Sequence, residues 1–132
     1  MRFRKFRLIL TLLLLGVGGW TSLRGDDDSE RTEEQQIMDH KLSHSQDILA
    51  SLAKEDFASM AASAEELMDL TEEQWVVNET PEFRAHLKNF WVVLEGLKTS
   101  AESEDLDEAT VAYMQMTLSC VKCHKYLRRK ID

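Results

Sequence analysis

Residues 81–100, PEFRAHLKNFWVVLEGLKTS, contain the clearest helical pattern of the chain. Their large apolar side chains recur every three or four residues, at Phe83, Leu87, Phe90, Leu94 and Leu97. This spacing places the five side chains on one face of an α-helix. Thr80 and Pro81 are typical of a helix start, because Thr can cap free N–H groups and Pro needs no N–H in the first turn. The stretch therefore predicts an amphipathic helix that buries one face in a helical core.

Three further segments show the same period, from about Glu33 to Leu52, Asp56 to Leu70 and Leu106 to Lys130. The side chains predicted to face inward are, in chain order, Met38, Leu42, Ser45, Leu49 and Leu52; Phe57, Met60, Ala64, Leu67 and Met68; and Leu106, Ala109, Tyr113, Met116, Cys120, Cys123 and Leu127. Several of these side chains are small or polar, so we expect the helices to leave space between them. No stretch alternates convincingly with a period of two residues, which argues against strands.

The connections between these segments are mostly short. Ala53–Glu55 leaves room only for a tight antiparallel turn, and Asp105 with Glu108 predicts the cap of the last helix. Thr71–Thr80 is the longest connection. Helices joined by short loops are antiparallel neighbours, so the predicted fold class is all-α, an antiparallel up-down-up-down four-helix bundle.

The composition of the 132 residues agrees with one helical domain and excludes several other classes of protein. Five Gly and one Pro are too few for the many turns of a β-sandwich, and two Cys cannot form a disulfide-dense scaffold. The chain carries 24 acidic and 16 basic residues, and every acidic residue lies at or after Asp26. Because an anionic body repels phosphates, we expect no nucleic-acid partner.

Residues 1–25 are predicted to be a signal peptide, with an uncleaved membrane anchor as the alternative. A basic start precedes an uncharged, mostly apolar stretch from Leu8 to Leu23. As a helix this stretch would span roughly 24 Å, less than the ~30 Å of a hydrocarbon core, which favours a cleaved signal. We therefore expect an exported, periplasmic protein that meets the inner membrane only if the leader is retained. Residues 26–36 are predicted as an acidic disordered spacer and residues 37–132 as the folded domain.

The last predicted helix contains Cys120-Val121-Lys122-Cys123-His124, the C-x-x-C-H pattern of covalent haem attachment. Each thiol of this pattern adds across one haem vinyl group, and the adjacent imidazole binds the iron as axial ligand. On a helix, Cys120, Cys123 and His124 are spaced i, i+3 and i+4, so they project from one face. The motif uses both cysteines of the chain. It predicts one covalently bound haem c, in agreement with export.

Three other uses of the two cysteines compete with haem. A disulfide across one turn of a helix would strain both residues, and a thioredoxin-like pair belongs at a helix start. The zinc alternative is a tetrahedral site made by His40, His44, Cys120 and Cys123, which would make the chain a metal-binding helical module. Without such a site, we expect His40, His44 and His86 to face solvent.

With C-x-x-C-H near the C-terminus, on the last of four helices, the chain resembles the class II c-type cytochromes, the cytochrome c′ family. The resemblance covers about Ile37 to Lys130 and is most specific from Cys120 to Arg128. In this family an Arg often follows the haem-binding His by four residues, and Arg128 has this position. Leu70–Trp75 is similar to the segment after the family's second helix. Tyr126 departs from the pattern, because the aromatic residue of the family commonly lies one position later.

The resemblance implies roles for the residues of the site. Cys120 and Cys123 would carry the haem thioethers, and His124 would be the proximal axial ligand. Arg128 would belong to the haem environment. The first helix would supply the distal side, where Met38 is the candidate sixth ligand of an electron carrier. An open, five-coordinate site would instead bind NO or CO, and neither version turns over an organic substrate, so we expect no enzyme activity.

Five basic residues cluster near the C-terminus of the anionic chain: Lys122, Lys125, Arg128, Arg129 and Lys130. We expect them either to stabilise the helix end or to dock an acidic redox partner protein. Members of the family are often dimers, and Ile37 and Ile48 would form an exposed second stripe that allows a homodimer. The function expected from the sequence is single-electron transfer by one covalent haem in the periplasm.

Overall fold

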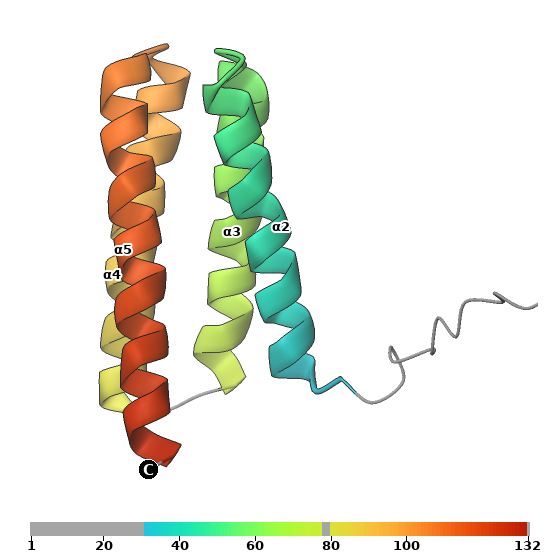
Figure 1. The fold of residues 1–132 in the computed structure, drawn as a ribbon, viewed down its shortest axis with the longest axis vertical. Coiled ribbons are helices and arrows are strands. Elements are labelled where there is room, and N and C mark those ends of the chain that lie inside the picture. The colour runs from blue at the N-terminus through green and yellow to red at the C-terminus, as the bar shows by residue number, and fades with distance from the viewer. Residues whose placement is uncertain (1–30, 78–79, 132) are drawn as a thin grey trace, which may run out of the picture. The chain divides into compact units, whose positions relative to one another are not determined.

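The computed structural model describes residues 31–77 and 80–131. The described residues form four helices, α2 (Glu33–Leu52), α3 (Phe57–Val77), α4 (Pro81–Glu102) and α5 (Leu106–Ile131), and contain no strand (Figure 1). α3 packs closely against α2 and α4, and α4 packs closely against α5. The predicted all-α, up-down-up-down four-helix bundle is therefore confirmed.

The predicted leader and residues 26–30 of the predicted spacer lie outside the described residues. Among the helices that are described, none is both long and apolar enough to span a membrane. Residues 33–36, which fall within the predicted spacer, form the first turn of α2. A capping box fixes this start, because Gln35 N–H donates to Thr32 Oγ1 at 3.3 Å and Thr32 N–H donates to Gln35 Oε1 at 3.0 Å.

Two matching turns join α2 to α3 and α4 to α5 at the same end of the bundle (Figure 1). Glu55 and Glu104 have positive φ angles of 55° and 56°, the left-handed conformation that reverses the chain after a helix. The next residue in each turn, Asp56 or Asp105, directly precedes the following helix. Asp105 Oδ1 accepts the N–H of Glu108 at 2.9 Å, which confirms the cap predicted for α5.

α3 is longer than predicted. The predicted connection from Thr71 continues as helix through Val77, and Thr71 and Gln74 are buried within it. No Gly or Pro interrupts this stretch, and the Thr71 hydroxyl donates to the carbonyl of Leu67 at 2.6 Å. The two polar side chains that resembled a loop therefore face the interior of the bundle.

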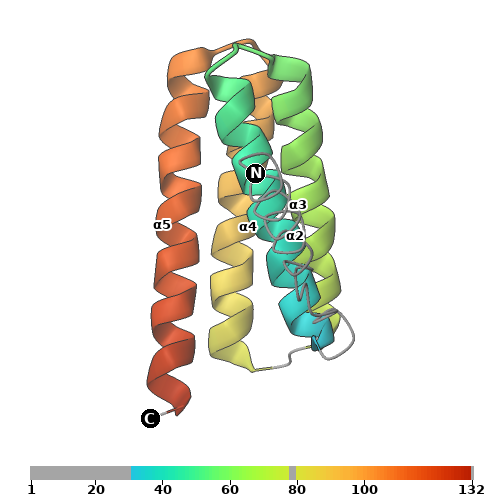
Figure 2. The ribbon, with the colours of Figure 1, turned by 45° about the vertical axis from the view of Figure 1, so that its right-hand side comes forward.

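The predicted inward face of α2 is wrong by about one residue. Leu42 and Leu49 are 59% and 52% exposed, whereas the residues buried on this helix are Ile37, Lys41, Ile48 and Ser51. α2 packs along α3 but makes only sparse contact with α5, and both ribbon views show it diverging from α5 toward its own N-terminus (Figures 1 and 2). Ile37 and Ile48 consequently lie in the core rather than on the exposed stripe expected for a homodimer.

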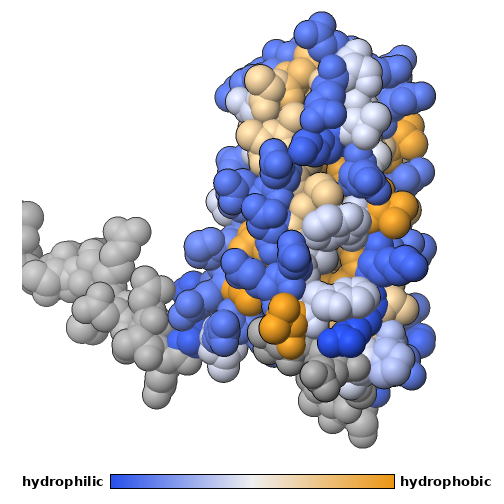
Figure 3. Space-filling view, turned by 180° about the vertical axis from the view of Figure 1, so that it is seen from behind, coloured by the Kyte–Doolittle hydropathy of each residue, from blue (hydrophilic) through white to orange (hydrophobic). Residues whose placement is uncertain are grey.

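The inward faces predicted for the other helices agree with the structure. Each of α3, α4 and α5 contributes fully buried side chains, among them Met60, Leu67, Leu94, Leu97 and Met116. The reverse side of the bundle is mostly hydrophilic, with apolar side chains scattered over it (Figure 3). The core therefore lies between all four helices and is thinnest where α2 faces α5.

Candidate functional site

A cavity of about 270 Å³ lies between α2, α4 and α5, with Gln74 of α3 contributing to its wall. Most of its walls are apolar or aromatic: Met38, Leu42, Phe83, Leu87, Phe90, Tyr113, Met116 and Val121. The divergence of α2 from α5 leaves this space, which confirms that the helices do not fill the interior completely. A cavity of this kind suits a ligand with a large apolar surface.

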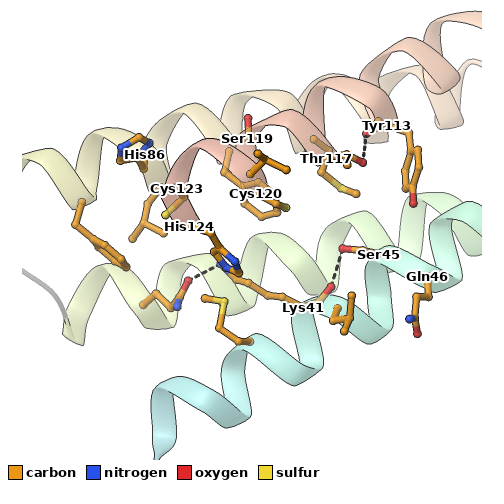
Figure 4. Close-up of a pocket in the computed structure, with 18 residues that line it drawn as sticks. Lys41, Ser45, Gln46, His86, Tyr113, Thr117, Ser119, Cys120, Cys123 and His124 are labelled. Carbon is orange, nitrogen blue, oxygen red and sulfur yellow. Dashed lines mark hydrogen bonds between the residues drawn. The ribbon is translucent and has the colours of Figure 1, made fainter. Parts of the chain in front are cut away.

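All three chemical residues of the C-x-x-C-H motif line this cavity (Figure 4). α5 is uninterrupted through the motif, so Cys120, Cys123 and His124 project from one face of the helix as predicted. The two cysteines are half-buried, and His124 is exposed at the cavity edge. The motif therefore presents two sulfur atoms and one imidazole to a single apolar space.

Both cysteines are free thiols. Burial raises the pKa of Cys120 and of Cys123, because the surroundings disfavour the thiolate, while the charge of Lys41 acts in the opposite direction. The thiols are consequently protonated at neutral pH. A redox-active pair would instead need a lowered pKa.

Lys41 reaches into the same cavity from α2 and is only 8% exposed. Its ammonium donates a hydrogen bond of 2.6 Å to Gln74 Oε1 and lies 5.0 Å from the ring centroid of Phe90. Burial lowers the pKa of Lys41 from its ordinary 10.5 to about 8, and the nearby charges of Cys120 and Cys123 counteract part of this effect. Among the residues described, no carboxylate forms an ion pair with Lys41.

Sequence reasoning missed both Lys41 and Gln74. The signal for Lys41 was its place four residues after Ile37 and seven before Ile48, on the stripe that is in fact buried. Gln74 fell within the predicted connection Thr71–Thr80, so it was not expected to be a buried helical residue. A long polar side chain on a buried stripe indicates either a satisfied hydrogen bond or a functional group, and here the hydrogen bond is present.

Other residues of α2 surround Lys41 in the cavity wall. Met38, the candidate distal ligand, is half-buried and lines the cavity one turn before Lys41. Leu42 is next to it and exposed. The hydroxyl of Ser45 donates to the carbonyl of Lys41 at 2.7 Å, so its proton is directed at the backbone. Besides the exposed amide of Gln46, α2 thus offers the cavity the sulfur of Met38 and the nitrogen of Lys41, neither of which is engaged with the helix backbone.

The four residues of the zinc alternative are not all brought together. His40 is exposed and does not line the cavity, and the His44 imidazole lies 3.9 Å from the Asp47 carboxylate on the same helix. In the part of the chain that the structure describes, no three side chains of His, Cys, Asp or Glu converge on a point where a metal ion could sit.

His86 is not the surface residue that the sequence suggested. It is half-buried on α4, lines the cavity, and stacks on Tyr126 with ring centroids 5.0 Å apart. Tyr126, the position that departs from the cytochrome c′ pattern, therefore packs against the neighbouring helix. Arg128 is exposed on α5 and does not line the cavity.

The predicted basic cluster borders the site. Lys122, Lys125, Arg128 and Arg129 are all exposed on the last turns of α5, on either side of the exposed His124. A cationic surface therefore adjoins the cavity edge on a molecule whose net charge is −8.

Comparison with protein-family models, with curated proteins and with solved structures found no match.

Proposed function

We propose that this protein is a monohaem c-type cytochrome that transfers single electrons after export to the periplasm. The observation that carries the proposal is the common cavity wall formed by Cys120, Cys123 and His124. The C-x-x-C-H spacing alone is a sequence pattern. Its support is stronger because the two free thiols and the imidazole meet an apolar space rather than solvent or a filled core.

The residues present fit a haem. Its flat, apolar ring needs apolar walls, which Leu42, Phe90 and Met116 supply, and an entrance, for which the sparsely packed boundary between α2 and α5 is suited. Haem attached here would supply the reversible one-electron change of its iron. The chain's own residues would bind and orient it and keep water away.

Both thiols of the motif would take part in the attachment. At each cysteine the sulfur would form one bond to a vinyl carbon, and the thiol hydrogen would go to the neighbouring carbon of the same vinyl group. No electron is gained or lost in this addition. The imidazole of His124 would supply the proximal ligand from the same helix.

The distal side belongs to α2 in this proposal. The resemblance to cytochrome c′ makes Met38 the candidate sixth ligand, and the thioether lines the cavity. If no donor atom of α2 bound the iron, the apolar space beside Leu42 would admit a small gas instead. This second function, binding of NO or CO at a five-coordinate site, is favoured by the same divergence of α2 from α5.

An acidic redox protein is the proposed partner. The exposed basic residues on both sides of His124 would attract an anionic surface to the edge of the haem, and complementary charge speeds such encounters. The rest of this anionic molecule would repel the same partner, so docking elsewhere is disfavoured.

The test is to produce the full chain in a periplasm equipped with the haem c attachment machinery. We expect mass spectrometry to find one haem covalently bound to the peptide that contains residues 120–124, together with the visible spectrum of a c-type cytochrome. The matched control is the Cys120→Ser/Cys123→Ser variant, which must lose the covalent haem. A colourless wild-type protein, or one that contains zinc and no haem, would overturn the proposal.

A further inference from the structure

The position of a haem tethered to α5 limits which residues can meet its far side. With thioethers at Cys120 and Cys123 and His124 on the near side, the opposite wall of the cavity is α2 (Figure 4). The side chains of α2 that line this wall are Met38, Lys41, Leu42, Ser45 and the exposed Gln46. A group of this chain that binds the iron opposite His124 is therefore expected to come from α2.

Lys41 is the most buried of these side chains. It is 8% exposed, whereas Met38 is half-buried and Leu42 is mostly exposed. Ser45 is excluded because its hydroxyl donates to the backbone carbonyl of Lys41. The close-up view shows Lys41 and His124 extending from facing helices into the space between α2 and α5 (Figure 4).

The Lys41 nitrogen is also held in place by neighbouring helices. Gln74 Oε1 of α3 accepts its hydrogen bond at 2.6 Å, and the Phe90 ring of α4 supports it at 5.0 Å. These partners direct one N–H toward α3. They are neutral, and no described carboxylate pairs with the ammonium, so the nitrogen is not committed to an ion pair. Lys41 lines the same cavity as both thiols of the motif.

We infer that the Nζ of Lys41, rather than the sulfur of Met38, binds the iron on the side opposite His124. The inference rests on the proposed function, because it concerns the distal side of the same haem. The ammonium releases one proton to solvent through the open side of the cavity, and the nitrogen lone pair forms the bond to iron without any transfer of electrons. Gln74 continues to accept one of the two remaining N–H groups, which leaves the lone pair free to face α5.

The first test uses the wild-type holoprotein and no substitution. Electron paramagnetic resonance and near-infrared magnetic circular dichroism of the oxidised protein distinguish a nitrogen from a thioether as sixth ligand. We expect a low-spin spectrum of the two-nitrogen type, without the weak red absorption band that a methionine ligand gives to oxidised haem. A thioether spectrum, or a high-spin spectrum, would overturn the inference.

The second test assigns the nitrogen. Lys41→Leu removes the donor atom and keeps a side chain of similar size. Lys41→Arg keeps the positive charge, but its side chain cannot bind the iron. We expect both variants to lose the low-spin signal and to bind CO when the haem is reduced. Met38→Leu is the matched control one turn away, and His86→Phe controls for the only other imidazole of the cavity wall among the described residues. Both controls should keep the wild-type spectrum, and loss of the low-spin signal in either one contradicts the assignment to Lys41.

The two proposals fail in different ways. If mass spectrometry finds no haem on the wild-type chain, the proposed function is wrong, and the assignment of Lys41 as distal ligand falls with it. If haem is attached and the Lys41 variants keep the wild-type spectrum, only the assignment of Lys41 is wrong. Far-ultraviolet circular dichroism of each holoprotein variant identifies any that has failed to fold, in which case the wild-type spectrum decides alone.

Discussion

The ammonium of Lys41 on α2 lies 2.6 Å from the side-chain carbonyl oxygen of Gln74 on α3, inside the cavity that the C-x-x-C-H motif lines. This hydrogen bond joins the two helices at the level where α2 diverges from α5. This hydrogen bond pairs the buried ammonium with a neutral acceptor, so no opposite charge offsets the free-energy cost of burying the cation. Because no described carboxylate pairs with Lys41, its nitrogen can take part in other chemistry.

We expect the haem-free protein to show the titration of Lys41 in its stability. The pKa of about 8 in the folded state lies below the ordinary 10.5, so between these pH values the unfolded chain binds more protons. The contribution of Lys41 to the free energy of unfolding therefore rises with pH across this window, by on the order of 3 kcal/mol, and is constant above it. The raised pKa values of Cys120 and Cys123 act oppositely above about pH 9, since their contribution falls as pH rises.

The measurement is urea unfolding at several pH values in the Cys120→Ser/Cys123→Ser background, which removes the opposing thiols. The rise between pH 8 and 10.5 should be present in this background and absent when Lys41→Met is added. An unchanged pH dependence after Lys41→Met would show that the lysine is not buried as a cation.

Replacement of Gln74 by Leu should destabilise the haem-free protein by about 1–3 kcal/mol, because it leaves the buried Lys41 ammonium without its acceptor. Gln46→Leu is a matched control on the cavity rim, where the side chain is exposed, and should change stability by no more than about 0.5 kcal/mol. Adding Lys41→Met to Gln74→Leu should recover much of the loss. Equal costs of Gln74→Leu with and without Lys41, measured as a double-mutant cycle, would mean that the two residues do not interact.

Two neighbouring residues of α2 test which face of this helix is buried. Ile48 is fully buried and Leu49 is 52% exposed. Ile48→Ala should lower the free energy of unfolding by about 2–5 kcal/mol, because it leaves a cavity in the core. Leu49→Ala should change it by about 0.5 kcal/mol or less. If thermal or urea unfolding showed a larger loss of stability for Leu49→Ala than for Ile48→Ala, the face of α2 predicted from the sequence would be the buried one.

Replacement of Glu55 or Glu104, whose backbones have a left-handed conformation, by glycine should stabilise the protein. Glu55 and Glu104 have φ angles of 55° and 56°, where a side chain carries a steric cost of about 1 kcal/mol that glycine does not. Glu55→Gly and Glu104→Gly should each raise the free energy of unfolding by about 0.5–1 kcal/mol. Glu66→Gly, at an exposed position inside α3, should lower it by about 1 kcal/mol. Destabilisation by both turn variants would show that the turns adopt another conformation.

The basic cluster predicts how charge controls electron transfer. At low ionic strength, Arg129→Glu should slow oxidation of the reduced holoprotein by the anion ferricyanide several-fold and should speed the reaction with a cationic metal complex. Lys54→Glu makes the same charge change in the turn at the other end of the bundle and should have little effect. Stopped-flow rates that respond equally to both substitutions would show that net charge, and not the cluster beside His124, sets the rate.

The sequence by itself determined the four helices and the chemical motif. Apolar side chains at three- and four-residue spacing bury one face only as a helix, so Phe83, Leu87, Phe90, Leu94 and Leu97 specified α4 without knowledge of its neighbours. The relative placement of Cys120, Cys123 and His124 on one face also follows from helix geometry alone. The assignment of these residues to haem stays a prediction.

Only the tertiary structure decided which face of α2 is buried and what reaches the cavity. The apolar residues of α2 allow two adjacent stripes, one with Leu42 and Leu49 and one with Ile37 and Ile48, and local spacing does not choose between them. The choice follows from the packing of α2 on α3 and its divergence from α5, which turns Lys41 inward and brings it to Gln74. Contacts between residues 33 positions apart have no signature in a single sequence, since they depend on how whole helices pack.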